Sequence, residues 1–273
     1  MIELRGVGYR LDTCPILQNV GFSVGEGELF GIIGPNGSGK STLLKLISGT
    51  ERLTDGEIII AGRSVASYGR KEMARMLAVL QQEGLPPLGF TVREVVEMGR
   101  YPYQNWFGDE ATDQDALLNN IMTRLDLNML AHRTLEQLSG GERQRVALAK
   151  TMAQQPRVLL LDEPTTYLDI GYQLQMMDYV RGWQQESKLT VIAVLHDLNL
   201  AALYCDRLLV LNGGEGWAIG KPDEVLQEQL VQQVYGTRPL MIRHPSEDVT
   251  QVLLRPSMLE MTDIGKGTNG IRK

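Results

Sequence analysis

Cysteine is scarce in this sequence. Its 273 residues include only two, Cys14 and Cys205, which lie far apart with no paired or metal-like spacing. A disulfide framework or a cysteine-ligated metal site needs several cysteines at short, regular spacings. We therefore expect two free thiols, buried or half-buried, in a reducing compartment.

Long apolar runs and an excess of positive charge are also missing. No window approaches the roughly 20 apolar residues of a membrane span, and the stretch MIELRGVGYRLD lacks the apolar core of a signal peptide. The formal net charge is -6, whereas nucleic-acid-binding proteins usually carry a basic face. These absences predict a cytosolic protein that binds no nucleic acid and reaches the cytoplasmic face of a membrane only through a partner.

The order of the apolar segments predicts an α/β fold. Short β-like runs separated by Gly-rich turns fill residues 1–62, and helical spacing of Leu and Ile dominates from about Leu88 to Gln155. Strand runs return in RVLLLDEP and LTVIAVLHD, whose continuous apolarity is typical of strands covered on both faces. A small amphipathic helix is expected in DEVLQEQLVQQVYG, and the final stretch, SMLEMTDIGKGTNGIRK, has no periodicity and is expected to fray.

A glycine-rich turn joins the apolar segment ELFGII to the helix-like segment LLKLISGT. Its sequence, GPNGSGKST, fits the pattern GxxxxGK[ST] of a phosphate-binding loop, in which small residues let backbone N–H groups point at phosphate oxygens. Lys40 is expected to bring positive charge to the β- and γ-phosphates, and the hydroxyl of Ser41 to hold Mg²⁺. The residues assigned to ATP are Gly34, Asn36, Gly37, Ser38, Gly39, Lys40, Ser41 and Thr42.

A carboxylate for the same metal ion is expected at the end of VLLLDEP. Asp162 closes the apolar run, so it would face Mg²⁺ at the carboxyl edge of the sheet, where ligands of such folds bind. Glu163 follows and is the candidate that polarises the attacking water, because hydrolysis needs a group that orients the nucleophile in line with the γ-phosphate.

A second set of small residues opens a helix in LSGGERQRVALAKTMAQQP. Ser139, Gly140 and Gly141 form another nest of N–H groups suited to an anion. One chain has no evident use for two such nests aimed at one γ-phosphate, whereas two chains that face each other head to tail do. With this motif the sequence resembles an ATP-binding cassette (ABC) ATPase, whose signature is LSGGQ-like and here is LSGGE, ending at Glu142.

The resemblance covers about residues 2–255 and implies a P-loop NTPase. Its RecA-like core with an antiparallel β subdomain would comprise residues 1–87 and 156–240, and its inserted α-helical subdomain residues 88–155. These parts would form a nucleotide-binding domain within residues 1–256, followed by a C-terminal extension over residues 241–273.

The resemblance also implies roles for residues outside the two nests. Tyr9 matches the aromatic residue that stacks on adenine, and His196 matches the histidine that contacts the γ-phosphate. Gln82 matches the glutamine that joins Mg²⁺ and the attacking water to the helical subdomain; the usual Pro before it is missing, and Gln81 is the alternative. Asp169 matches the aspartate of a loop that crosses the dimer interface.

Hydrolysis at a shared site is the mechanism that the resemblance implies. MgATP would bind to one chain while the signature residues of the partner chain close on the γ-phosphate, so that ATP joins two copies into a homodimer. Glu163, His196 and Gln82 would then promote attack by water. Loss of the γ-phosphate would open the dimer, and that motion would do the work.

The substrate class is suggested by TVREVVEMGRYPYQNWFG, residues 91–108. Its GRYP stretch resembles ATPases of importers for iron-siderophores, heme and cobalamin, which implies a polytopic permease fed by an extracytoplasmic substrate-binding protein. Tyr101, Tyr103 and Trp106 would anchor the permease, although a surface loop rich in aromatics is the simpler interpretation. We expect uptake of chelated iron; the alternatives are another transported substrate or a soluble regulatory ABC protein without a permease.

Overall fold

The structure is a computed structural model that describes residues 1–81, 85–87, 89–104, 114–166 and 168–255. Its central sheet has six strands in the order β10-β9-β3-β8-β7-β6. Five of them run parallel, and β10 pairs antiparallel with β9 at one edge. Every residue of β3 and β8 is buried, as their continuous apolarity predicts. The bounds are Leu29–Ile33 (β3), Leu77–Leu80 (β6), Val158–Asp162 (β7), Thr190–Val194 (β8), Arg207–Asn212 (β9) and Glu215–Gly220 (β10).

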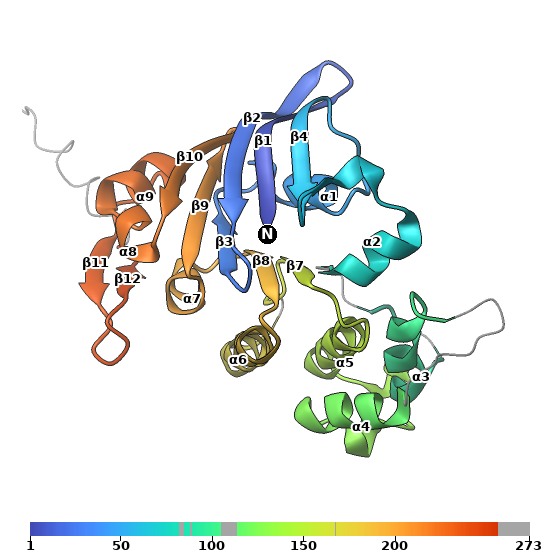
Figure 1. Cartoon of the computed structure of the whole chain (residues 1–273). Helices are drawn as coiled ribbons and strands as arrows, with labels where there is room; N and C mark the ends of the chain where they lie inside the picture. The colour runs from blue at the N-terminus through green and yellow to red at the C-terminus, as the bar shows by residue number, and fades with distance from the viewer. Residues whose placement is uncertain (82–84, 88, 105–113, 167, 256–273) are drawn as a thin grey trace, which may run out of the picture.

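A smaller antiparallel sheet, in the order β2-β1-β4-β5, lies on the same side of the central sheet as helix α1 (Figure 1). Its apolar side chains, those of α1 and one face of the central sheet form one buried cluster. Within it the rings of Phe22 and Phe30 stack with their centroids 5.1 Å apart. The bounds are Ile2–Leu11 (β1), Cys14–Val24 (β2), Asp55–Ile60 (β4), Arg63–Ser64 (β5) and Lys40–Ile47 (α1).

Helices α5, α6 and α7 pack on the other face of the central sheet, and α3 and α4 pack beside α5 to form a helical lobe (Figure 1). Thr91 is the N-cap of helix α3, and its side chain and that of Glu94 form a reciprocal capping box. The helices are Arg70–Met76 (α2), Val92–Glu97 (α3), Gln114–Arg124 (α4), Gly140–Ala153 (α5), Ile170–Ser187 (α6) and Leu198–Tyr204 (α7). Short 3-10 turns cover Val65–Ser67 (η1), Met98–Arg100 (η2), Asn128–Leu130 (η3) and Leu135–Gln137 (η4).

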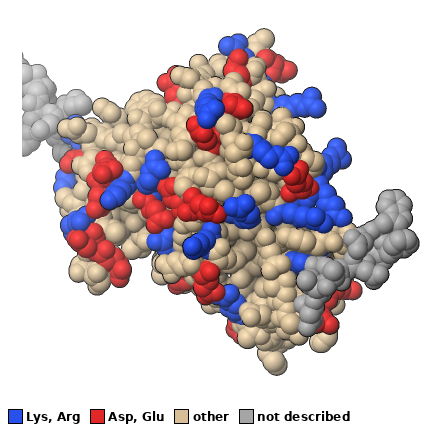
Figure 2. Space-filling model, in the orientation of Figure 1, with Lys and Arg blue, Asp and Glu red and all other residues tan. Residues whose placement is uncertain are grey.

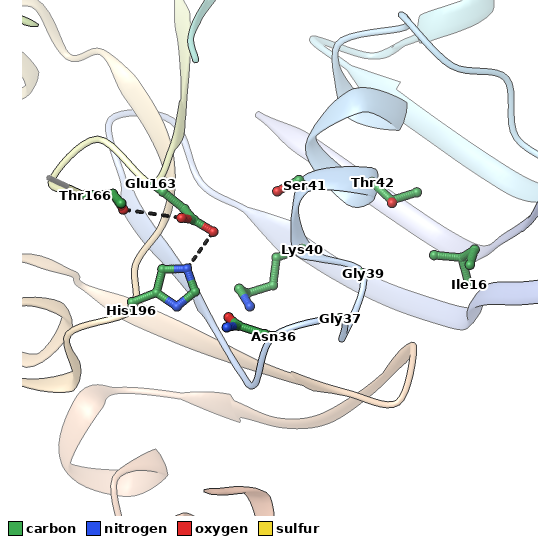
Figure 3. A pocket seen from close by; sticks show the side chains of 10 residues that line it. All are labelled: Ile16, Asn36, Gly37, Gly39, Lys40, Ser41, Thr42, Glu163, Thr166 and His196. Carbon is green, nitrogen blue, oxygen red and sulfur yellow. Dashed lines mark hydrogen bonds and ion pairs between the residues drawn. The ribbon is translucent and has the colours of Figure 1, made fainter. Parts of the chain in front are cut away.

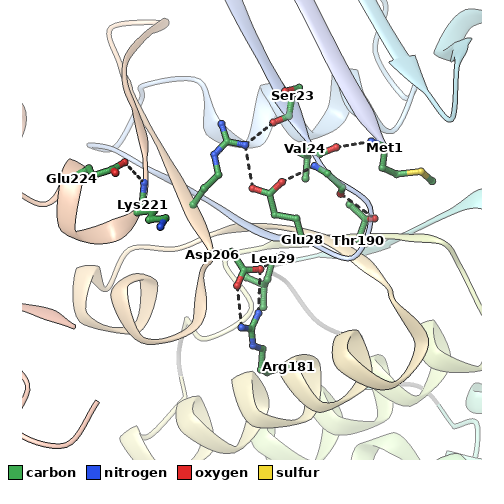
Figure 4. Close-up of polar contacts among 12 residues, drawn as sticks. Met1, Ser23, Val24, Glu28, Leu29, Arg181, Thr190, Asp206, Lys221 and Glu224 are labelled. Carbon is green, nitrogen blue, oxygen red and sulfur yellow. Dashed lines mark hydrogen bonds and ion pairs between the residues drawn. The ribbon is translucent and has the colours of Figure 1, made fainter. Parts of the chain in front are cut away.

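Polar contacts hold the strand that leads to the glycine-rich loop in place (Figure 4). The Asp206 carboxylate accepts a hydrogen bond of 2.8 Å from the backbone N–H of Leu29 and pairs with the guanidinium of Arg181 on α6 at 3.0 Å. Glu28 accepts a bond of 2.6 Å from the N–H of Gly25 and pairs with Arg207 at 3.3 Å. The start of β3 is therefore fixed to α6 and β9 before the chain reaches the site.

The C-terminal part departs from the expected single helix in DEVLQEQLVQQVYG. The structure has two helices there, Pro222–Val225 (α8) and Glu228–Tyr235 (α9). The chain leaves the helical conformation at Leu226, whose ψ is 70° and whose side chain is buried, and Gly236 ends α9 with a φ of 69°. A two-stranded antiparallel hairpin follows, formed by Leu240–Arg243 (β11) and Thr250–Leu253 (β12).

The surface bears on three of the expectations drawn from composition. Cys205 is buried, but Cys14 is exposed on β2, so the expectation of two covered thiols was wrong for Cys14. Cys14 begins β2, a strand at the edge of the small sheet, and its side chain faces solvent. Among the described residues, no helix has the length and apolarity to cross a membrane. Basic and acidic side chains are interspersed over the face shown in Figure 2.

Candidate nucleotide site

The glycine-rich loop joins β3 to α1 and folds around the side chain of Lys40 (Figure 3). Lys40 is 5% exposed, and its Nζ donates hydrogen bonds of 2.9 Å to the backbone oxygens of both Gly34 and Pro35. Burial lowers the pKa of Lys40, while the nearby carboxylates of Glu163 and Asp162 oppose that shift. The loop thus holds a buried ammonium group beside two acidic residues.

Backbone geometry explains two of the glycines in this loop. Gly34 has a φ of 149°, and a β-carbon there would lie 1.9 Å from the backbone oxygen of Leu211 in β9. Gly39 has a φ of 99°, and a β-carbon there would lie 2.7 Å from the side chain of Leu17. Any other residue at these positions would meet both backbone strain and a steric overlap.

Asp162 ends β7 next to the first turn of α1. The hydroxyl of Ser41 donates a hydrogen bond of 2.9 Å to Asp162 Oδ1. Burial raises the pKa of Asp162, the bond from Ser41 opposes that shift, and the neighbouring Glu163 adds to it. Because burial disfavours the charged form of this carboxyl, a bound cation would stabilise it.

Glu163 has the left-handed backbone conformation, with a φ of 51°, which is uncommon for a residue other than glycine. Its Oε1 lies 2.5 Å from Nε2 of His196, which follows β8, and its Oε2 accepts a hydrogen bond of 3.3 Å from the hydroxyl of Thr166 (Figure 3). Glu163 and His196 follow the ends of the neighbouring strands β7 and β8, and the carboxylate of one contacts the imidazole of the other.

These groups face a cavity of about 680 Å³ (Figure 3). The structure brings together in its lining most of the residues expected to bind nucleotide and promote hydrolysis, while Gly34 and Ser38 lie in the loop behind it. Sequence reasoning missed Ile16 and Thr166, because a lone Ile in a strand and a Thr in a turn carry no chemical signal. The lining residues are Ile16, Asn36, Gly37, Gly39, Lys40, Ser41, Thr42, Glu163, Thr166 and His196.

Tyr9 lies one strand away from this cavity. It is half-buried in β1, pairs with Leu17 of β2 and packs against the apolar cluster beneath the small sheet. It is not among the lining residues, whereas Ile16, next to Leu17, is. Stacking of adenine on Tyr9 stays a prediction.

The signature residues lie at the N-terminus of α5, outside the residues that line the cavity. Ser139 is the N-cap: its backbone N–H and its hydroxyl each donate to Glu142 Oε2, at 2.7 and 2.8 Å. These bonds favour the charged form and so lower the pKa of Glu142, whose carboxylate lies beside the helix N-terminus. Ser139 and Gly140 are exposed, and the ring of Tyr172 lies against Gly141, where a β-carbon would be 3.3 Å from it.

The remaining expected residues are spread around the site. Asp169 is exposed at the N-terminus of α6, two residues beyond a gap in the described chain. Gln82 and Trp106 lie outside the described residues. Gln81, the alternative glutamine, is exposed and lines a smaller cavity of about 180 Å³ with residues of α5.

The two expected docking tyrosines have different surroundings. Tyr101 is 61% exposed. Tyr103 is half-buried, with the guanidinium carbon of Arg100 4.1 Å and that of Arg75 5.2 Å from its ring centroid. Arg100 is itself buried and donates a hydrogen bond of 2.6 Å to the backbone oxygen of Ala153 at the end of α5. Tyr103 is therefore part of a structural contact between α2 and the helical lobe.

The glycine-rich loop, the acidic strand end and the surrounding sheet define a P-loop nucleotide-binding protein. Comparison with known proteins specifies its kind, since the ABC transporter family matches residues 17–166. FpuC, a petrobactin import ATP-binding protein of Bacillus anthracis, is 41% identical over 236 residues, or 86% of this chain and 87% of FpuC. YvrA, an uncharacterized ABC transporter ATP-binding protein of Bacillus subtilis, is 40% identical over 242 residues, or 88% of this chain and 55% of YvrA. BtuD, a cobalamin import ATP-binding protein of Halobacterium salinarum, is 38% identical over 256 residues, or 93% of this chain and 64% of BtuD.

The chain thus spans less than two thirds of YvrA and of BtuD, but most of FpuC. Solved structures agree with this grouping. The dimeric structure of the bacterial ABC transporter cassette MJ0796 matches with a TM-score of 0.70 and 30% identity over 81% of this chain and 99% of that chain. CbiO1 of Clostridium perfringens, part of an ABC transporter complex, matches with a TM-score of 0.73 and 27% identity over 85% of this chain and 92% of CbiO1. The chain belongs to the ABC transporter family and is an ATP-binding subunit that hydrolyses ATP for transport.

Proposed function

We propose that the chain energises an importer of chelated iron, in which two copies hydrolyse MgATP below a membrane permease. The observation that carries the chemistry is the Glu163 and His196 pair, with 2.5 Å between carboxylate and imidazole at the rim of the cavity that holds Lys40. The similarity to FpuC supports the substrate class, because FpuC is named for petrobactin import and aligns over most of its length.

Lys40 would bind the terminal phosphates. In the structure its ammonium group is bonded to two backbone oxygens of its own loop. Phosphate oxygens carry full negative charge, so they would form stronger, charge-assisted hydrogen bonds with it than those carbonyls do. The N–H groups at the start of α1 would bind the same phosphates, together with Asn36 and Thr42 in the cavity lining.

Ser41 and Asp162 fit a Mg²⁺ site. Both offer oxygen atoms, the ligands that this cation prefers, and they lie within 2.9 Å of each other. The pKa of Asp162 is raised by burial, which a cation would offset. Mg²⁺ bound there would neutralise charge that develops on the phosphates.

Glu163 and His196 would act on the attacking water. The carboxylate of Glu163 accepts a hydrogen bond from the water and orients its oxygen toward the γ-phosphate. His196, whose side chain is 39% exposed, fixes one oxygen of that carboxylate and presents its imidazole to the cavity. Gln82 stays a candidate for the link to the helical lobe, and it lies outside the described residues.

A second copy would complete the site. Ser139, Gly140 and Glu142 are outside the cavity of their own chain, and the first two are exposed at a helix N-terminus. A partner that presents these groups to the γ-phosphate would add an anion-binding nest that a single chain does not supply. The dimeric form of the MJ0796 cassette supports this arrangement.

The permease would be bound through the loop that carries Tyr101. This side chain is exposed, as an interface anchor must be before docking, whereas Tyr103 is engaged with two guanidinium groups. We therefore assign docking to Tyr101 and a supporting role to Tyr103. Trp106, the third aromatic residue expected to dock, lies outside the described residues.

Uptake by cells that lack the chain tests the proposal. Cells complemented with the parental chain should accumulate a ferric siderophore, cells complemented with Lys40→Ala should not, and an Arg70→Ala variant on exposed α2 should match the parent. Uptake of cobalamin, measured in the same cells, decides the alternative that the similarity to BtuD favours. If cells that lack the chain still take up both substrates, and no permease copurifies with the chain, the alternative of a soluble regulatory ABC protein is favoured.

A further inference from the structure

The C-terminal hairpin β11–β12 is attached to the helix that follows His196. Helix α7 begins at Leu198, and the side chain of Asn199 on its first turn faces the outer edge of β12. Asn199 Oδ1 accepts a hydrogen bond of 2.7 Å from the backbone N–H of Val252, and Asn199 Nδ2 donates one of 3.3 Å to the backbone oxygen of Val252. One carboxamide thus pairs with both polar backbone groups of Val252.

The same strand of the hairpin has a second anchor, at Thr250, two residues before Val252. Asp223 on α8 accepts hydrogen bonds from the backbone N–H of Thr250, at 3.0 Å, and from its hydroxyl, at 2.7 Å. The second oxygen of Asp223 pairs with Arg243 of β11 at 2.6 Å. Thr250 and Val252 are buried between these contacts. The hairpin is therefore held at two points, and one of them is α7.

His196 depends on α7 for its position. The N–H of Leu195 bonds to the backbone oxygen of Ile32 at 3.1 Å, which fixes the chain just before His196. The Asp197 carboxylate caps α7 by accepting bonds from the N–H groups of Asn199 and Leu200 at 2.7 and 3.1 Å, which fixes the chain just after it. A shift of α7 would therefore move the imidazole relative to Glu163.

We infer that Asn199 is a positioning residue for hydrolysis: by binding the edge of β12, it uses the C-terminal hairpin to hold α7 and so keeps His196 in register with Glu163. The inference rests on the proposed role of His196. It gives a function to residues 240–253, which lie outside the range matched by the ABC transporter family. A small displacement of a reacting group costs up to about 10² in rate, so a loosened helix is sufficient to slow the reaction.

Steady-state hydrolysis by the full chain tests the inference. Asn199→Leu keeps the size of the side chain and loses both bonds to Val252; we expect kcat to fall about tenfold with KM for ATP nearly unchanged, since the phosphate loop is untouched. Asp223→Ala releases the second anchor of the hairpin and should also lower kcat. Asn128→Leu, which removes an exposed bond to Thr123 in the helical lobe, is the matched control and should hydrolyse like the parent.

A double-mutant cycle separates positioning from a general loss of stability. In a His196→Ala chain, Asn199→Leu should cause no further loss of kcat, because there is no imidazole left to position. If Asn199→Leu lowers kcat equally in the parental chain and in the His196→Ala chain, Asn199 contributes to stability alone and the inference is overturned. The inference is also overturned if Asn199→Leu hydrolyses ATP at the parental rate while His196→Ala is slow. A parental rate for His196→Ala would overturn both the inference and the role proposed for that histidine. A parental chain that hydrolyses no ATP would contradict the proposed function itself.

Discussion

Replacing Glu163 by Gln tests the chemistry most directly. The two side chains have the same size, and Gln keeps one acceptor oxygen for the contact now made with Thr166 or His196. The backbone strain at a φ of 51° is the same for both residues, so the fold should be unchanged. What the substitution removes is the negative charge and the ability to accept a proton from water.

The expected loss in kcat is about 10² or more, the scale for removing a positioned general base. A factor of 10² corresponds to about 2.7 kcal/mol of activation free energy. ATP binding should be retained or strengthened, because Glu163 lines the cavity that the phosphates would enter and its charge repels theirs. The variant should therefore accumulate as an ATP-bound dimer.

Two measurements on the purified chain are needed, phosphate release under saturating MgATP and molecular mass with and without ATP. Glu72→Gln is the matched control, since Glu72 pairs with Arg63 on the surface far along the chain from the site. The control should hydrolyse ATP at the parental rate. If Glu163→Gln does so too, Glu163 is not the group that activates water.

Four further outcomes are expected. Lys40→Ala should weaken ATP binding itself, measured by nucleotide titration, and an unchanged affinity would contradict the assignment of the phosphate loop. Asp162→Asn should raise the unfolding temperature of the nucleotide-free chain at neutral pH. Because burial raises the pKa of Asp162, the stability that this carboxyl contributes is present when it is protonated and is lost as the pH rises through that pKa. A lower unfolding temperature would refute the reasoning. Ser139→Arg should abolish the ATP-dependent dimer. Mixing Ser139→Arg chains with Lys40→Ala chains should restore partial dimerisation, because a mixed dimer keeps one composite site intact. ATP-induced dimers of Ser139→Arg alone would indicate that each chain works by itself. Tyr101→Glu should abolish copurification with the membrane without a change in unfolding temperature. Tyr103→Ala should instead lower the unfolding temperature, because it removes the ring between two guanidinium groups. Full membrane association of Tyr101→Glu would show that its loop has no docking role.

The fold class was accessible from the sequence, because its signals are local. The strand β1 covers the stretch IELRGVGYRL, and the apolar runs around Leu160 and Ile192 form the strands β7 and β8, whose residues are all buried except Asp162. The fold class, an α/β P-loop NTPase with an antiparallel β subdomain, is confirmed. The α/β class and the covered strands follow from periodicity and turn chemistry within a dozen residues, whereas the antiparallel β subdomain was implied by the resemblance to ABC ATPases.

What sequence reasoning missed depends on contacts between distant segments. The helix expected over 223–236 is interrupted at Leu226, which is buried in a non-helical backbone conformation that amphipathic spacing does not reveal. Tyr103 was expected on the surface, because the sequence does not show that Arg75 on α2, 28 positions earlier in the chain, packs against its ring. The roles assigned to Tyr9 and Asp169 stay predictions, because they concern a nucleotide and a second chain.

The close approach of Gly34 to Leu211 affects how mutations in the phosphate loop must be interpreted. This glycine is enclosed by the strand β9 on the side away from the cavity, so any larger residue would push the loop and the strand apart whether or not ATP is bound. A random mutagenesis screen would therefore find position 34 intolerant for reasons of folding alone. Position 37 differs, because a β-carbon there would meet no atom within 4 Å, and the φ of 78° leaves backbone strain as the only cost of a larger residue before nucleotide binds.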